Sequence, residues 1–195
     1  MELARVRTVM LGGGRSQRMG FDKLTALFDG EPLARRVARA LLELEPLFVT
    51  TPQVAAMLRD LRGVRVVETP PTAGPSVTLA LANAAIDSGA YLAVLPGDLP
   101  FLDAERVRAF VASVPHDADL AWPVVGGTPG HPVLWSPRAR ARIASLGAQD
   151  APSRIRTQPG LRVAALEDTD DAYVTDVDTP DAWTASEARA RRARR

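Results

Sequence analysis

The alternation of apolar runs and amphipathic segments along the chain predicts a βαβ arrangement. Four apolar runs have the length of buried strands, at residues 6–11, 47–50, 64–67 and 91–95. Between and after them, residues 33–44 and 107–114 carry apolar side chains at helical spacing. Parallel strands joined by helices predict an α/β fold, a three-layer α/β/α Rossmann-like arrangement with a mostly parallel central sheet.

The boundaries of several helices are marked by residues that favour the first or last turn. Helices are expected to start at Thr51-Pro52, Pro75-Ser76, Ser136-Pro137 and Thr179-Pro180. Gly89 is expected to stop the helix that begins near Pro75.

The second half of the chain has a less regular pattern. Short strand candidates lie at residues 120–124, 132–135 and 161–166. We interpret them as part of the same domain, which gives one domain over residues 1–188 followed by a basic C-terminal tail, RARRARR, at residues 189–195.

The segment LGGGRSQRMGFDK, residues 11–23, follows the first apolar run directly. Its glycines allow bare backbone amides to approach a ligand closely, and its cations suit an anion such as a polyphosphate. Two common phosphate loops are excluded: a Walker A loop has no match, and Gln17 occupies the place of the third glycine in a dinucleotide fingerprint. Because ligands bind at the carboxyl ends of parallel strands, this loop and PGDLP at residues 96–100 are expected at one edge of the sheet.

Composition narrows the class of protein. The chain has 195 residues with 46% hydrophobic and 24% charged residues, which is typical of a globular domain, and it lacks an apolar run long enough for a membrane span. The absence of a signal-peptide pattern predicts a cytoplasmic protein. Zero cysteines exclude disulfides and thiolate zinc sites, and two distant histidines argue against a histidine metal site.

Basic residues are almost all arginine. Lys23 is the single lysine among 24 basic residues, so we expect it where a compact ammonium is needed. The tail carries five arginines and no acid; we interpret it as a solvated, frayed helix end, with a nucleic-acid or acidic-partner contact as the alternative.

The glycine loop and four later segments carry a family resemblance. These segments are LGGGRSQRMGFDKLTALFDGEPLARRV, GPSVTLALANA (74–84), PGDLPFLD (96–103), GHPVLWSP (130–137) and DVDTPDAW (176–183). In order and spacing they resemble the MobA-like nucleotidyltransferases, the molybdenum cofactor guanylyl- and cytidylyltransferases. The resemblance implies a Mg²⁺-dependent enzyme that moves a nucleoside monophosphate from an NTP to a phosphorylated acceptor, most simply molybdopterin, and releases pyrophosphate.

Two aspartates are the candidate magnesium ligands. Asp98 follows a predicted buried strand on the same edge as the loop, whereas Asp103 is better placed to cap the next helix. In TDVDTP, Asp176 and Asp178 are expected to alternate on a strand, and Asp178 is the second candidate ligand. The acids between residues 167 and 171 are interpreted as a solvated turn.

The resemblance also implies the roles of individual residues. Catalytic roles fall to Arg15, Lys23 and Asp98, and the metal ligands are Asp98 and Asp178. The residues expected to bind the nucleotide are Leu11, Gly12, Gly13, Gly14, Arg15, Arg18, Lys23, Glu68, Gly74 and Asp98. His131 in GHPV is expected to contact the acceptor, with plain polar surface as its alternative, and His116 is assigned to solvent.

The nucleotide base is less sharply indicated. Glycine at the third place of LGGG resembles the guanylyl-transferring members and favours GTP. GHPV and the last acid of DVDTP resemble the cytidylyl-transferring members, so CTP is the alternative nucleotide. The sequence is also compatible with a sugar or cobinamide phosphate as the acceptor, with a non-catalytic nucleotide-binding regulator, and with an interaction protein that acts through the arginine tail.

Overall fold

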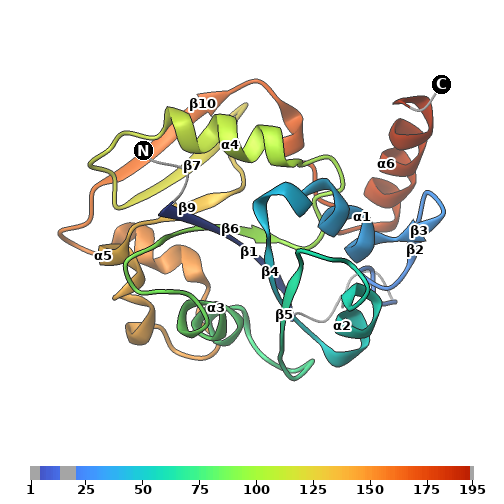
Figure 1. The fold of residues 1–195 in the computed structure, drawn as a ribbon. Helices are drawn as coiled ribbons and strands as arrows, with labels where there is room; N and C mark the ends of the chain where they lie inside the picture. Colours follow the sequence, from blue (N-terminus) through green and yellow to red (C-terminus); the bar gives the residue numbers. More distant parts are fainter. Residues whose placement is uncertain (1–4, 14–20, 194–195) are drawn as a thin grey trace.

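The computed structural model describes residues 5–13 and 21–193, and its centre is a twisted β-sheet (Figure 1). In the described part of the chain the sheet has eight strands, with the order β10-β7-β9-β6-β1-β4-β5 and β8 paired to β7. The strands are β1 (Val6–Gly12), β4 (Leu47–Thr50), β5 (Arg65–Glu68), β6 (Tyr91–Pro96), β7 (Leu120–Val125), β8 (Thr128–Pro129), β9 (Val133–Trp135) and β10 (Val163–Asp168). A separate hairpin pairs β2 (Leu27–Phe28) with β3 (Glu31–Pro32).

The sheet is mostly parallel, which confirms the predicted fold class. β5, β4, β1 and β6 run parallel, and β10 is parallel to β7, whereas β9 is antiparallel to both of its neighbours. The strands from the second half of the chain join the same sheet as those from the first half. The carboxyl ends of β1, β4, β5 and β6 therefore share one edge.

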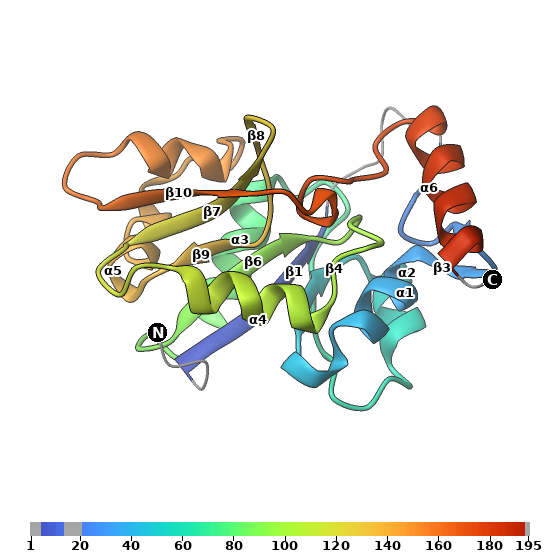
Figure 2. The same ribbon diagram turned by 90° about the horizontal axis from the view of Figure 1, so that it is seen from above.

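Helices cover both faces of the sheet (Figures 1 and 2). One face packs against α1 (Leu33–Ala40), α2 (Pro52–Leu58) and α4 (Ala104–Ser113). The other packs against α3 (Pro75–Ala84), α5 (Pro137–Arg140) and the 3-10 helices η3 (Ile143–Ser145) and η4 (Pro152–Thr157). The last helix, α6 (Pro180–Ala193), lies beside α1 and the hairpin, and η2 (Leu42–Leu44) and η5 (Asp171–Tyr173) complete the fold.

The strands alternate between the two cores. In β1, Val9 packs into the core beside α3 and Met10 into the core beside α1, and both are fully buried. Because successive side chains of a strand point to opposite faces, a strand buried on both faces is apolar throughout. The continuous apolar runs are thereby explained.

Several local predictions were wrong. The segment that holds Asp176 and Asp178 is irregular rather than a strand, although Val177 between them is buried and Asp176 is exposed. The helix α3 ends at Ala84, so Gly89 lies beyond its end in a turn.

The prediction that Asp103 caps the next helix is confirmed. Its carboxylate accepts a hydrogen bond from the Arg106 backbone N–H at the start of α4.

The acids at residues 167–171 do not form a single turn, although Glu167, Asp168 and Asp171 are exposed as predicted. Glu167 and Asp168 lie in β10. Asp170 forms an ion pair with Arg106 at 2.7 Å, and both carboxylate oxygens of Asp171 accept hydrogen bonds from Arg189 at 2.8 Å. These pairs fix the chain between β10 and α6.

The predicted tail begins inside α6. The helix continues to Ala193, Ala190 is 2% exposed, and the Arg189 guanidinium lies 4.1 Å from the centroid of the Phe101 ring. Arg189 and Ala190 thus pack against the rest of the structure, whereas residues 191–193 are helical but exposed. Among the described residues, no helix has the length and apolar character needed to cross a membrane.

Candidate active site

The site begins where β1 ends. The Leu11 carbonyl accepts a hydrogen bond from the Gly97 N–H at 3.1 Å, which joins the end of β1 to the turn after β6. The Thr50 hydroxyl, at the end of β4, donates to the Gly12 carbonyl at 3.0 Å. The carboxyl ends of three neighbouring strands are therefore tied together by polar contacts at this edge.

Gly13 is a glycine because the protein itself leaves no room for a side chain. A Cβ atom there would lie 2.8 Å from Thr69 Cγ2 and 2.9 Å from Thr78 Oγ1. Both distances are shorter than ordinary van der Waals contact. The close approach of Gly13 to Thr69, which follows β5, and to Thr78 in α3 thus requires this glycine independently of any anion. The amino-acid sequence alone does not reveal this reason.

Lys23, Asp98 and Asp178 come together at the same edge. Asp22 organises the turn that carries Lys23, since its carboxylate accepts a hydrogen bond from the Leu24 N–H at 3.1 Å. The Lys23 ammonium donates to Asp98 Oδ2 and to Asp178 Oδ1. Asp98 lies just past β6 and Asp178 just before α6, so one ammonium joins three distant segments.

The burial of this cluster strengthens its electrostatics. The Lys23 and Asp98 side chains are each 12% exposed, and Asp178 is 35% exposed. Burial lowers the pKa of Lys23, but the attraction of Asp98 and the hydrogen bonds to both carboxylates outweigh it and raise the pKa above 10.5. Lys23 is therefore a cation at neutral pH.

The two carboxylates fit a divalent cation that also binds phosphate. Asp98 Oδ1 is buried and accepts no hydrogen bond from any described residue, so it has a free lone pair. The described residues contain no group of three or more His, Cys, Asp or Glu side chains around one point. Magnesium at one or two carboxylates, with phosphate oxygens and water as the other ligands, matches this donor set.

A cleft of about 590 Å³ lies beside the cluster and shares Asp178 with it. Its walls come from β1, β6, β7, β9, α3 and η4, and they are mostly apolar. The lining residues are Leu11, Gly13, Pro75, Thr78, Val94, Leu95, Pro96, Leu120, His131, Val133, Trp135, Pro152, Ser153, Arg156 and Asp178. A volume of this size suits a small-molecule ligand.

Three polar side chains of the cleft wall have unusual surroundings. His131 Nδ1 and Trp135 Nε1 are buried with no hydrogen-bond partner among the described residues. The Arg156 guanidinium lies 4.2 Å from the centroid of the Trp122 ring. Burial lowers the pKa of His131 and also that of Arg156. His131 is therefore predominantly neutral at pH 7, and it faces the cleft rather than forming plain polar surface.

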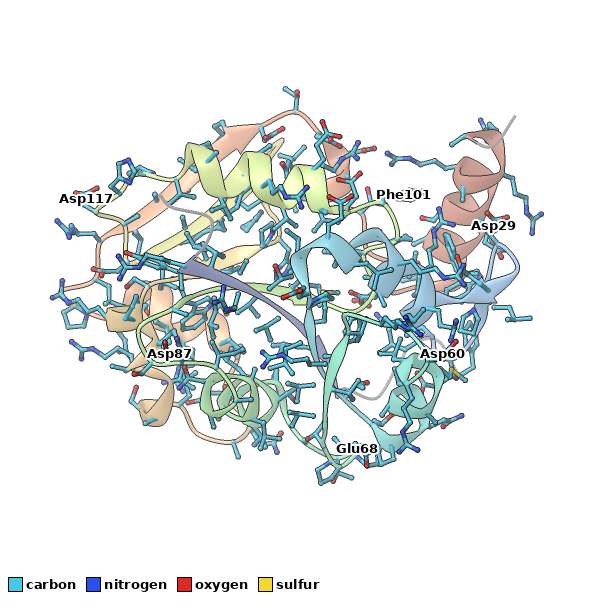
Figure 3. All side chains as sticks on the ribbon, viewed as in Figure 1. Asp29, Asp60, Glu68, Asp87, Phe101 and Asp117 are labelled. Atoms are coloured by element: carbon cyan, nitrogen blue, oxygen red, sulfur yellow. The ribbon has the colours of Figure 1, made fainter. Side chains whose placement is uncertain are left out.

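The other predicted site residues are placed less centrally. Glu68 is exposed at the end of β5 and pairs with Arg59 at 3.1 Å, at the outer edge of the molecule (Figure 3). Gly74 precedes α3, where a Cβ atom would lie 2.3 Å from the Ala148 carbonyl oxygen. Neither residue lines the cleft. Gly14, Arg15 and Arg18 lie outside the described residues.

Sequence reasoning missed Trp135 and Arg156 as cleft residues. A signal for Trp135 was present, because His131, Val133 and Trp135 alternate along GHPVLW and all three line the cleft. For Arg156 no local pattern existed, since its position depends on how η4 packs over the sheet.

Comparison with known proteins places the chain in a family. Residues 8–161 match the model of the MobA-like NTP transferase domain. The chain belongs to this family. Its members are nucleotidyltransferases, and the sequence-based prediction of family and enzyme class is thereby confirmed.

Relatives by sequence include proteins named as molybdenum cofactor guanylyltransferases. A probable molybdenum cofactor guanylyltransferase from Natronomonas pharaonis is 33% identical over 152 residues, 73% of this chain and 75% of that protein. A molybdenum cofactor guanylyltransferase from Rhizobium johnstonii is 31% identical over 163 residues, 80% of this chain and 75% of that protein.

Solved structures share the fold at low sequence identity. A homologue of Mycobacterium tuberculosis rv0371c from Mycobacterium sp. strain JC1 has a TM-score of 0.80 and 23% identity, covering 97% of this chain and 98% of that one. Molybdopterin-guanine dinucleotide biosynthesis protein A from Archaeoglobus fulgidus has a TM-score of 0.75 and 16% identity, covering 95% of this chain and 99% of that one. A manganese complex of Rv0371C from Mycobacterium tuberculosis has a TM-score of 0.75 and 20% identity, covering 93% and 97%.

Proposed function

We propose that this nucleotidyltransferase moves GMP from GTP to molybdopterin with Mg²⁺ and releases pyrophosphate. The observation that carries the proposal is the meeting of Lys23, Asp98 and Asp178 at the carboxyl edge of the sheet, beside a cleft large enough for an acceptor. Relatives at 33% and 31% identity that are named as guanylyltransferases support the nucleotide and the acceptor.

In this proposal each charged group has one task. Asp98 and Asp178 hold Mg²⁺, supported by the free lone pair of Asp98 Oδ1. Lys23 binds the triphosphate, together with Arg15 and Arg18 from the loop outside the described residues. When bound, the metal supplies positive charge that neutralises the triphosphate and orients it.

The reaction is one in-line displacement. A phosphate oxygen of the acceptor forms a bond to the α-phosphorus of GTP, while the bond from that phosphorus to the bridging oxygen breaks and pyrophosphate leaves with the electron pair. Lys23 stabilises the negative charge that grows on the leaving phosphates. The route needs no covalent enzyme intermediate, which agrees with a chain that has no cysteine.

The acceptor is proposed to occupy the cleft. Asp178 belongs both to the cleft wall and to the charged cluster, so a ligand in the cleft lies next to the reacting phosphates. His131 faces this space with a buried nitrogen that lacks a partner among the described residues, which supports its predicted contact with the acceptor.

CTP is the second candidate nucleotide. Asp178, the last acid of DVDTP, pairs with Lys23, and the guanylyl-transferring members often carry asparagine at that place. The guanylyl pattern also has an acid shortly upstream of GPSV; here that acid is Glu68, which is exposed and paired with Arg59. These two observations favour the cytidylyl branch, whereas Gly13 and the named relatives favour the guanylyl branch.

Pyrophosphate release tests the proposal. The protein is incubated with Mg²⁺ and GTP, CTP, ATP or UTP. The acceptor is molybdopterin, a sugar phosphate, cobinamide phosphate or none, and pyrophosphate and the nucleotidylated product are measured. We expect release with GTP only when molybdopterin is present. Release with CTP would move the enzyme to the cytidylyl branch, and release only with a sugar or cobinamide phosphate would replace the acceptor.

Thermal shift separates binding from catalysis in the same panel. A ligand at one hundred times its dissociation constant stabilises the folded state by about 2.7 kcal/mol, so the correct NTP raises the melting temperature measurably. If an NTP stabilises the protein but releases no pyrophosphate with any of the acceptors, the result would instead indicate a nucleotide-binding regulator.

A further inference from the structure

The Lys23 ammonium occupies the space between the two proposed metal ligands. It donates one hydrogen bond to Asp98 Oδ2 and another to Asp178 Oδ1. A divalent cation shared by the two aspartates needs an oxygen of each within about 2.1 Å, in the case of magnesium. The space between Asp98 Oδ2 and Asp178 Oδ1 is therefore already filled by a cation that belongs to the protein.

Charge makes the two cations compete. The net charge of the Lys23 ammonium and the two carboxylates together is −1. Without the ammonium, the two carboxylates carry a net charge of −2. At partly buried positions the repulsion between an ammonium and a divalent cation a few ångström apart is strong, since Lys23 and Asp98 are each only 12% exposed. A metal held by Asp98 Oδ2 and Asp178 Oδ1 together would require the Lys23 side chain to swing away.

A triphosphate offers Lys23 another partner. Lysine carries its ammonium on a flexible four-carbon stem, so it can exchange one anion for another without moving the backbone. The backbone of Lys23 lies in a turn fixed by Asp22, and the glycine loop that precedes it comes from the end of β1. In the proposed function the triphosphate binds Lys23, so it competes with the two carboxylates for the ammonium.

We propose that Lys23 is an exchangeable counter-ion that keeps the Asp98–Asp178 pair closed to a bridging metal until a triphosphate draws the ammonium away. The enzyme then takes up the metal together with the nucleotide and not before it. The inference rests on the proposed function for the identity of the triphosphate, but the exclusion of metal by Lys23 is a property of the free protein.

Manganese binding to the nucleotide-free protein tests the exclusion directly. Mn²⁺ is titrated into the wild type and into Lys23→Gln, and free Mn²⁺ is measured by electron paramagnetic resonance. We expect Lys23→Gln to bind Mn²⁺ at least about tenfold more tightly than the wild type, because the competing charge is gone. Equal Mn²⁺ affinities of the wild type and Lys23→Gln overturn the proposal. This result would also be found if the metal bound through Asp98 Oδ1 without displacing Lys23.

Two control variants separate the specific effect from a general change of charge. Lys23→Arg keeps a cation between the carboxylates and is expected to bind Mn²⁺ as weakly as the wild type. Arg108→Gln removes a cation from a distant exposed pair, with Glu43 at 2.7 Å, and is expected to leave Mn²⁺ affinity unchanged. If Arg108→Gln tightened binding as much as Lys23→Gln, the proposal would be wrong.

The single lysine allows a measurement on the unaltered protein. Protein labelled with ¹⁵N-lysine gives one side-chain ammonium signal, from Lys23. We expect Mg²⁺ alone to leave this signal in place and Mg²⁺ with a non-hydrolysable triphosphate analogue to shift it. A saturating shift with micromolar Mg²⁺ alone overturns the inference. Since no acceptor or turnover is involved, this outcome is independent of whether pyrophosphate release fails.

Discussion

Lys23 and Asp178 are 155 positions apart in the chain, yet the Lys23 ammonium donates a hydrogen bond to the Asp178 carboxylate. The contact joins the turn after the glycine loop to the segment just before α6. With Asp98 as the second acceptor, it also brings the end of β6 into the same cluster. The charge of Asp178 is therefore expected to matter for both phosphate and metal.

Replacement of Asp178 by asparagine tests its role as a metal ligand. Asp178→Asn keeps the shape and removes the charge, so we expect the Mn²⁺ affinity of the nucleotide-bound enzyme to fall by at least about tenfold. Titration calorimetry with a non-hydrolysable NTP present measures the affinity. The matched control is Asp181→Asn, the same change at an exposed acid in the first turn of α6, where no effect is expected.

The close approach at Gly13 predicts a stability effect. Gly13→Ala would place its Cβ atom 2.8 Å from Thr69 Cγ2, so β1 and its neighbours must shift. Overpacking of this kind costs about 1–3 kcal/mol, to be measured by urea unfolding. Gly89→Ala is the control, because its nearest neighbour, Asp87 Oδ1, would be 3.8 Å away. A destabilisation by Gly89→Ala equal to that by Gly13→Ala would contradict the explanation.

The Tyr173 side chain predicts a loss of stability at high pH. Burial, with the nearby charges of Asp168 and Asp170, raises the pKa of Tyr173 to about 12 from 10.0. The unfolded chain then loses the phenol proton at lower pH than the folded chain does. The contribution of Tyr173 to the free energy of unfolding is therefore fully present below pH 10 and is lost as the pH rises towards 12.

Unfolding of Tyr173→Phe checks this assignment. The variant removes the titrating group and also the hydrogen bond from the Tyr173 hydroxyl to the Arg106 carbonyl at 2.9 Å. We expect it to be about 1 kcal/mol less stable than the wild type at pH 8. The difference should shrink between about pH 10 and pH 12. A difference that stays constant over this range would show that Tyr173 does not titrate as described.

The end of α6 is expected to contribute to stability rather than to binding. Truncation after Ala188 removes the buried Ala190 and the Arg189 contacts with Asp171 and Phe101, whose side chain lies between α4 and α6 in Figure 3. We expect a loss of about 1–2 kcal/mol, measured by thermal unfolding, with turnover retained below the melting temperature. Arg192→Ala, at an exposed position, is expected to be neutral. Loss of turnover without loss of stability would instead favour an interaction role for this segment.

The fold could be predicted from the sequence because its strands are buried on both faces. Runs such as residues 91–95 are continuously apolar, and only a covered parallel sheet explains several of them in one chain. The strand expected around Asp176 and Asp178 failed for the opposite reason. Val177 is buried in the core between the exposed Asp176 and the half-buried Asp178, so burial alternates there as in a strand. However, no neighbouring strand in the described structure pairs with this segment, and its backbone is irregular.

The sequence predicted those site residues that belong to a short continuous motif. Lys23 and Asp98 lie in contiguous segments that resemble the family, whereas the pairing of Glu68 with Arg59 and of Asp171 with Arg189 depends on tertiary packing. Side-chain partners across such distances follow from how helices dock on the sheet. Periodicity along the chain does not contain that information.

Nucleotidyl transfer in the proposed mechanism depends on Asp98, and Asp98→Asn tests that dependence. The initial rate of pyrophosphate release is measured with Mg²⁺, molybdopterin and the preferred NTP, beside a circular dichroism spectrum of each protein. We predict a rate at least about a hundredfold below that of the wild type, with an unchanged spectrum and a melting temperature within a few degrees. A variant that turns over at a near-normal rate would contradict this role of Asp98.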